Sequence, residues 1–432
     1  MPRRKWFQVL MVTVVTACLL ALSGVTSAQG NSDNAFERVK EVQERHTERL
    51  MAGEGVVGTA VGLDEKGGNA VVVLLERPGV SGIPTDLEGV PVRPVVTGRI
   101  YASLKPPTAG GKPAKTPPLA PTNLTAVAIN GGQVNLVWQD NASNEAGFRI
   151  ERKTTGGFAL IATVGAGATT YSDTGLSPST KYTYHVCAYN NAGNSTYSNE
   201  ASATTPAGEV SPYPRPAPIG ISTGHPNITA GTISCRVKKT DGATTYYYAL
   251  SNNHVYADEN RASLGDNALQ PGPYDGGQNP RDAIGTLAAF QQIVFSRSAS
   301  NQIDAAIVLC PLTMLDNGTP AGSYGIPKSV TVPALVGLAV QKHGRTTGLT
   351  TGQVYAVNAT VNVGYDSGTA RFINQIVITP GTFSAGGDSG SLIVTQSGNN
   401  PVGLLFAGSS SVTIANPIDL VLDYFGVAVD GQ

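Results

Sequence analysis

The chain has 432 residues, a net charge of -1 and only 14% charged residues. This length corresponds to about three domains, and the lack of a basic surplus argues against a nucleic-acid partner. The 51 glycines and 28 prolines argue against a coiled coil and are typical of β-rich domains with many turns.

The N-terminus has the pattern of a secretory signal. Three basic residues, Arg3 to Lys5, precede an apolar run over residues 6–22, and small residues follow up to Ala28. This predicts a signal peptide over residues 1–28 and a secreted or periplasmic protein. The stretch VTAC resembles a bacterial lipobox, and lipidation of Cys18 is the one membrane attachment that the sequence suggests. The apolar residues after Cys18 favour the plain signal.

Two proline-rich segments, residues 105–118 and 207–218, divide the rest of the chain and predict extended linkers. Before the first linker, residues 31–104 combine a weak helical stripe with three strand-like segments. We therefore predict a small α+β domain without a catalytic cluster. Its position after the signal peptide suggests a propeptide or folding aid. The three predicted strands cover residues 56–63, 69–76 and 90–97.

The middle part, residues 119–206, shows an alternating all-β pattern. The segment KYTYHVCAY repeats apolar residues at period two, which predicts a strand with one buried face. Leu176, Pro178 and Tyr182 are spaced as in a tyrosine corner, and Trp138 matches a core tryptophan. The segment resembles a fibronectin type III domain. That resemblance implies a β-sandwich that acts as a spacer or contacts a protein or polysaccharide.

Three cysteines follow the predicted signal. The alternation places Cys187 on the outer face of its strand, where we expect an accessible, reactive thiol. Cys235 and Cys310 are the one pair inside a single predicted domain. An exported protein permits a disulfide between them, and two buried thiols are an equally good interpretation.

The last part, residues 219–432, contains many short apolar segments separated by glycine turns, which predict an all-β domain. Asn416 and Pro417 precede an apolar-periodic segment that stops at Gly426. This is the pattern of one C-terminal helix with an N-cap, a proline in its first turn and a glycine stop.

The glycine-rich stretch TFSAGGDSGSLIV contains a serine, Ser389, directly before a strand-like run. A serine hydroxyl is a weak nucleophile unless a histidine base and a carboxylate serve it. His254 alone among the five histidines ends an apolar strand, in YALSNNHV. Asp304 lies at the start of another apolar strand, in NQIDAAIVL. We therefore predict a catalytic triad of His254, Asp304 and Ser389.

These motifs, in this order, resemble those of a trypsin-like serine peptidase of the chymotrypsin fold. LSNNHV, IDAAIV and GGDSGS match the histidine, aspartate and serine motifs, and VGLLFAGSS matches the strand that binds substrate. The resemblance is greatest to a bacterial branch that is also similar to the plant Narrow-leaf-type peptidases. It implies a double β-barrel with a C-terminal helix, and secreted endopeptidase activity on proteins or peptides through an acyl-enzyme. It also implies an oxyanion hole formed by the N–H groups of Gly387 and Ser389. Gly386 and Gly387 would allow positive φ values in this loop.

The resemblance also implies a substrate pocket formed by Phe383, Phe406, Ala407 and Gly408. Two of these positions depart from the family pattern. Phe406 replaces a serine that contacts the catalytic aspartate in many relatives. Phe383 replaces the aspartate of relatives that cleave after basic residues, so a basic preference is not expected.

In bacterial relatives a basic residue in the glycine-threonine turn pairs with the aspartate beside the nucleophile. The segment VQKHGRTTG matches that turn and predicts an ion pair between Lys342 and Asp388. No cofactor motif and no cluster with metal-ligand spacing is found in the sequence. The alternative function is a catalytically inactive secreted binding or adhesion protein that uses its fibronectin type III domain.

Overall fold

The computed structural model describes residues 34–102, 116–130, 133–153, 156–174, 176, 180–205 and 213–432. The predicted signal peptide with Cys18, most of the first linker and half of the second lie outside these ranges. The chain divides into two compact units, Met1–Val95 and Val96–Gln432. No helix within the described ranges is long and apolar enough to cross a membrane.

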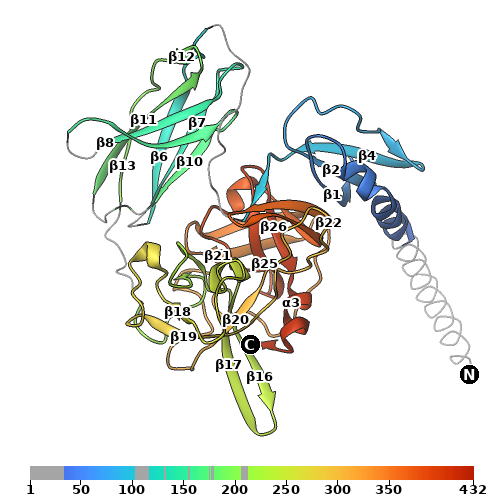
Figure 1. The fold of residues 1–432 in the computed structure, drawn as a ribbon, viewed down its shortest axis with the longest axis vertical. Helices are drawn as coiled ribbons and strands as arrows, with labels where there is room; N and C mark the ends of the chain where they lie inside the picture. Colours follow the sequence, from blue (N-terminus) through green and yellow to red (C-terminus); the bar gives the residue numbers. More distant parts are fainter. Residues whose placement is uncertain are drawn as a thin grey trace, which may run out of the picture. The chain divides into compact units, whose positions relative to one another are not determined.

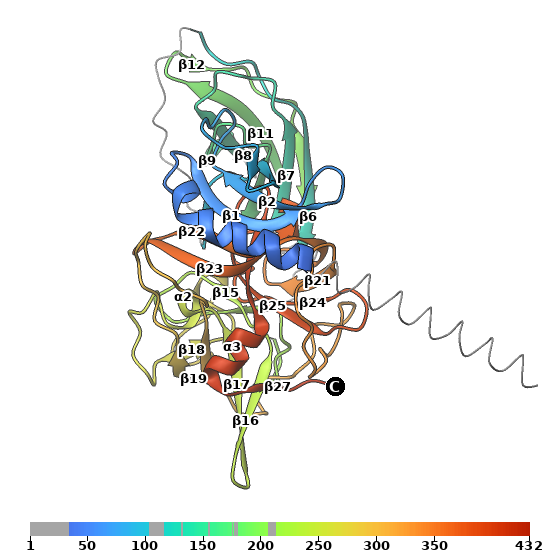
Figure 2. The same ribbon diagram turned by 90° about the vertical axis from the view of Figure 1, so that its right-hand side faces the viewer.

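The first unit is a small α+β domain. Residues 34–51 are helical, and the strands pair in the order β1-β2-β4-β3. The helix lies across the sheet (Figure 2). Its apolar residues Val39, Val42 and Leu50 share a core cluster with Val61 and Val73 of the sheet. Burial of one face of each element is what stabilises so small a domain. The strands are β1 (Val56–Leu63), β2 (Asn69–Leu75), β3 (Asp86–Leu87) and β4 (Val90–Val96).

The second unit begins with a short strand, β5 (Ile100–Tyr101), and continues into a β-sandwich. One sheet of the sandwich has the order β10-β7-β6. The other has the order β12-β11-β8-β9, with β13 paired to β11 (Figure 1). The strands are β6 (Thr122–Asn130), β7 (Gln133–Gln139), β8 (Gly147–Lys153), β9 (Ala159–Gly165), β10 (Thr170–Thr174), β11 (Lys181–Asn190), β12 (Gly193–Asn194) and β13 (Ala201–Thr204).

The sandwich core contains the residues that the alternation predicts. Trp138 lies 5.6 Å from Phe148 between ring centroids, and Tyr182 and Tyr184 are buried in the same cluster. Pro178 of the predicted tyrosine corner lies outside the described residues. The expectation for Cys187 is wrong, because its side chain is buried. Burial raises the pKa of this thiol, so it lacks the thiolate character of a reactive cysteine.

The first half of the C-terminal part forms a six-stranded antiparallel sheet in the order β18-β19-β20-β17-β16-β27. Its apolar residues and Val421 of helix α3 (Ile418–Phe425) share one core cluster. The strands are β16 (Arg236–Asp241), β17 (Thr244–Ser251), β18 (Asn267–Leu269), β19 (Ala283–Phe290), β20 (Ala306–Leu309) and β27 (Ala428–Val429). A small ribbon, β14 (Ser222–Thr223) with β15 (Gly231–Thr232), lies beside the loop of Ser389, since Thr232 N–H donates to the Ser389 carbonyl at 2.7 Å.

The second half closes into a barrel, because the order β21-β24-β25-β26-β23-β22 is completed by pairing of β21 with β22 (Figure 1, orange and red). Strand β22 is unusually long, with 18 residues, and forms a hairpin with β23. The mostly β fold class with a C-terminal helix is therefore confirmed. The strands are β21 (Ala339–Gly344), β22 (Gly348–Tyr365), β23 (Gly368–Thr379), β24 (Leu392–Thr395), β25 (Pro401–Gly408) and β26 (Thr413–Pro417).

The C-terminal helix differs from its prediction by one position. Its N-cap residue is Pro417, and Asn416 belongs to strand β26. Gly426 ends the helix with a φ of 61°, a left-handed conformation that favours glycine. The possible disulfide is wrong, because Cys235 and Cys310 are unpaired buried thiols. Burial raises the pKa of each to about 12.

Candidate active site

His254 and Asp304 are brought together by two paired strands. Strand β17 ends at Ser251 and pairs there with Ala306 at the start of β20. His254 follows β17 in the single-turn helix α2 (Asn253–Tyr256), and Asp304 directly precedes β20. His254 Nδ1 lies 2.6 Å from Asp304 Oδ2. The backbone N–H of His254 also donates to Asp304 Oδ1, at 3.2 Å.

The Asp304 carboxylate has no exposed surface. A buried charge is costly unless hydrogen bonds and charge partners compensate for the lost water. Here the phenol of Tyr365 donates to Asp304 Oδ2 at 2.9 Å, in addition to the two bonds from His254. The backbone of Asp304 is held by side chains of Asn252 and Asn416, at 2.8 Å and 3.1 Å. These contacts fix both the position and the orientation of the carboxylate.

Ser389 lies in the loop between the short 3-10 helix η2 (Gly381–Phe383) and strand β24. Gly387 has a φ of 94°, and a Cβ atom there would lie 2.5 Å from Thr346 Oγ1. Glycine is therefore required at this position, both for its backbone conformation and for space. The expectation of a positive φ at Gly386 is wrong, since the second glycine of this loop with a positive φ is Gly390, at 98°.

The predicted oxyanion donors belong to this loop. Within the described part of the chain, the backbone N–H groups of Gly387 and Ser389 donate to no protein acceptor. Neighbouring N–H groups are occupied, because Asp388 donates to the Ala385 carbonyl and Gly390 to the Leu405 carbonyl. The loop thus leaves unused the two donors that an oxyanion would need.

Lys342 and Asp388 approach each other inside the barrel. Lys342 Nζ lies 3.5 Å from Asp388 Oδ2, and neither side chain is exposed. Burial lowers the pKa of the Lys342 ammonium, and the adjacent carboxylate opposes that shift. Asp388 Oδ1 also accepts the backbone N–H groups of Thr346 and Thr347, at 2.8 Å and 3.1 Å. The neighbouring base Arg345 pairs instead with Asp275, at 2.6 Å.

The hydroxyl of Ser389 is engaged by a segment far away in the sequence. It donates to the carbonyl oxygen of Ala102 at 3.1 Å. Tyr101 pairs antiparallel with Gly408 of β25, and Ile100 pairs parallel with Val363 of β22. No hydrogen bond between Ser389 Oγ and His254 Nε2 is formed among the described residues. Residues 100–102 therefore lie beside β25, the predicted substrate-binding strand, and end at Ser389.

The four predicted pocket residues have different surroundings. Phe383 and Phe406 have no exposed surface, and Ala407 is buried. Phe383 packs in the barrel core, and Phe406 lies 4.7 Å from Phe372 between ring centroids. Gly408 pairs with Tyr101. Neither phenylalanine ring therefore presents an open face on which a substrate side chain can rest.

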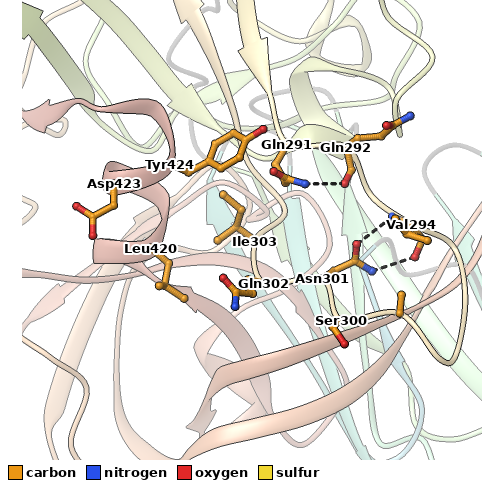
Figure 3. Close-up of a pocket in the computed structure, with 11 residues that line it drawn as sticks. Gln291, Gln292, Val294, Ser300, Asn301, Gln302, Ile303, Leu420, Asp423 and Tyr424 are labelled. Atoms are coloured by element: carbon orange, nitrogen blue, oxygen red, sulfur yellow. Dashed lines mark hydrogen bonds between the residues drawn. The ribbon is translucent and has the colours of Figure 1, made fainter.

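A separate cavity of about 610 Å³ is shown in Figure 3. Ile303, the residue before Asp304, lines it, together with Gln291, Gln302 and Tyr424 of α3. It contains no member of the predicted triad and no basic side chain. The cavity is therefore separate from the candidate active site.

Two family models match the chain. The fibronectin type III domain model matches residues 119–204, and the Nal1 C-terminal domain model matches residues 323–415. The chain thus contains a fibronectin type III domain, as its motifs implied. The second match covers most of the second barrel, where the glycine-threonine turn and Ser389 lie.

Three individual proteins are similar to parts of the chain. An α-amylase of Niallia circulans is 42% identical over 94 residues, which are 21% of this chain and 7% of the amylase. A glutamic acid specific serine protease is 24% identical with a TM-score of 0.36, and protease A of Thermobifida fusca is 20% identical with the same TM-score. These structures cover 49% and 50% of this chain, and the matches span 100% of each protease.

Three parts of the site could not be found from the sequence motifs. Tyr365 ends an alternating strand before a DSG turn, which gives no sign of a contact with Asp304. The sequence pattern predicts a helix cap at Asn416, but its side chain accepts from the Asp304 N–H and donates to Gln375. Ala102 lies in a segment without any catalytic motif.

Proposed function

We propose that this protein is a secreted serine endopeptidase that cleaves peptide bonds through an acyl-enzyme formed on Ser389. One observation carries the proposal. His254 Nδ1 is held at 2.6 Å from the buried Asp304 carboxylate, while a peptide carbonyl already lies at the Ser389 hydroxyl. A histidine oriented by a carboxylate and a serine in contact with a peptide carbonyl are the parts that acyl transfer requires.

The roles of the residues follow from these positions. Ser389 Oγ attacks the scissile carbonyl carbon while His254 Nε2 takes its proton. His254 later returns that proton to the leaving amine, and water hydrolyses the acyl-enzyme with the same base. Asp304 orients the ring and stabilises the imidazolium. The N–H groups of Gly387 and Ser389 would bind the oxyanion, and each such donor contributes about 2.7–4 kcal/mol to lowering the barrier.

A fluorophosphonate probe tests this function against the alternative of an inactive binding protein. Such probes react with a serine only when a base activates it. We expect stoichiometric labelling at Ser389 once residues 100–102 no longer contact it. Mass spectrometry of tryptic peptides would locate the label. A processed protein that remains unlabelled at Ser389 would support the binding protein instead.

The contact of Ala102 with Ser389 supports a propeptide role for residues 31–104. A hydroxyl that donates to this carbonyl cannot at the same time donate to His254, so the segment keeps the site latent. We propose that the enzyme is released by cleavage close to Ala102. This would leave the fibronectin type III domain attached, as a spacer or as a contact module for proteins or polysaccharides.

We expect the purified full-length chain to shorten with time to a product whose new N-terminus lies just after Ala102. Residues 31–104 added to that product should inhibit peptide hydrolysis. A fragment that stops at Arg99 should inhibit far less, because it lacks the residues that reach Gly408 and Ser389. N-terminal sequencing and inhibition curves measure both effects. Equal inhibition by the two fragments, or none by either, would refute the latent-site proposal.

A further inference from the structure

The hydroxyl of Tyr365 contacts Asp304, although no sequence motif marks Tyr365. It is the last residue of β22 and lies at the tip of the long β22–β23 hairpin. Its phenol donates to Asp304 Oδ2 at 2.9 Å, the same oxygen that His254 Nδ1 approaches at 2.6 Å. Burial of the phenol and the nearby Asp304 charge raise the pKa of Tyr365 well above its usual value. The hydroxyl therefore keeps its proton and remains a donor.

The hairpin tip is clamped to the segment that carries His254. Glu259 follows helix α2, and its carboxylate accepts the backbone N–H groups of Asp366 and Ser367, at 3.1 Å and 2.8 Å. The Glu259 side chain is 8% exposed, so these bonds are formed largely out of water, where they are strengthened. Since Asp366 and Ser367 follow Tyr365 directly, the clamp fixes the phenol relative to His254.

Aromatic contacts hold the Tyr365 ring in the same place. Its centroid lies 5.6 Å from that of Phe295 and 6.1 Å from that of Phe372. The His254 ring meets it edge-on, at 6.0 Å and 70°. Phe372 in turn packs against Phe406 of β25. Strand β25 therefore presents the ring of Phe406 on this side of the site, and the hydroxyl that contacts Asp304 comes from β22.

We propose that Tyr365 is the positioning residue that orients the Asp304 carboxylate, and that Glu259 holds it through the hairpin tip. The inference rests on the proposed peptidase function. The donor fixes the rotation of the carboxylate, so that Oδ2 stays directed at His254 Nδ1. It also spreads the negative charge of Asp304, which limits how strongly the carboxylate favours the protonated imidazole.

The test is Tyr365→Phe, which removes only the hydroxyl. Without it the carboxylate is more basic and stabilises the imidazolium more strongly, so His254 should hold its proton to higher pH. We expect the acid limb of the kcat/KM profile to move up by about 0.5–1 pH unit, because a hydrogen bond to a charged form shifts a titration by this order. In the plateau, kcat should fall about tenfold, since a charge-assisted bond that orients the base is lost.

Tyr256→Phe is the matched control. This residue lies in the same helix as His254 and is buried, but its hydroxyl accepts from Thr223 at 3.3 Å and does not contact Asp304. The control should leave the acid limb in place, whatever it does to stability. An acid limb that is unchanged in Tyr365→Phe, or that moves equally in both variants, would overturn the inference.

A second measurement keeps the inference separate from the function. In the Ser389→Ala background, where hydrolysis plays no part, the His254 imidazole can be titrated by NMR. The added Tyr365→Phe change should raise the pH at which it titrates. If the His254 titration shifts but the fluorophosphonate does not label Ser389 in the parent protein, the positioning role is upheld and the peptidase function is rejected. If the parent is labelled but the titration does not shift, the peptidase function is upheld and the positioning role is rejected.

Discussion

Ser389→Ala is expected to reduce kcat for peptide hydrolysis by about 10⁶, because loss of one triad member removes the whole nucleophilic route. Thermal unfolding should change little. The Ser389 hydroxyl makes one hydrogen bond, to the Ala102 carbonyl, and a single neutral bond of this kind contributes about 0.5–1.5 kcal/mol. The full-length variant should also remain uncut near Ala102. Initial rates with a peptide library, a melting curve and intact-mass spectra check the three expectations.

The control for this variant is Ser411→Ala, which changes an exposed serine beyond the end of β25. It should hydrolyse peptides, react with the fluorophosphonate and process itself as the parent does. If Ser389→Ala retained appreciable hydrolysis, the assignment of the nucleophile would be wrong. Processing near Ala102 in that variant would instead indicate that another protease makes the cut.

The second large effect is expected for Lys342→Met. Methionine roughly preserves the length and apolar stem of lysine but leaves the Asp388 carboxylate without its cation. Breaking a buried ion pair in this way costs about 3–5 kcal/mol. Asp388 also accepts the Ala385 N–H at 2.9 Å and the Thr347 hydroxyl at 2.6 Å, so its displacement would disturb the loop of Gly387. We expect kcat to fall about tenfold or more as the oxyanion donors lose their alignment.

Lys239→Met provides the comparison, since Lys239 is an exposed lysine of strand β16. Its ammonium donates to the Phe425 carbonyl at the end of α3, at 3.5 Å, so the variant should leave kcat unchanged and lower the free energy of unfolding by at most about 1 kcal/mol. The competing mechanism is activation by a new N-terminus near Ile219, which would supply the partner of Asp388. In the structure Ile219 is buried and its N–H donates to the Gly318 carbonyl at 2.9 Å. An unaffected Lys342→Met variant, or activity that first appears after cleavage near Ile219, would reject the internal pair.

The sequence by itself determined the features that rest on local patterns. The period-two alternation of residues 182–188 predicts the buried face of β11, because side chains alternate across a strand. The glycines around Ser389 predict a fixed loop, because only glycine adopts the φ of 94° at Gly387 without strain. The residue types of His254, Asp304 and Ser389 identify the candidate triad, because His254 follows an apolar strand while Asp304 and Ser389 each precede one.

Only the tertiary structure decided which distant groups complete the site. Tyr365 is 61 residues from Asp304 and Ala102 is 287 residues from Ser389, and no local pattern encodes such contacts. Cys187 shows the same limit on a smaller scale. Alternation predicts which side of a strand a residue is on, but its burial depends on what covers that side. Contacts between remote segments are set by how strands pair and sheets close, and this is decided by packing of the whole core.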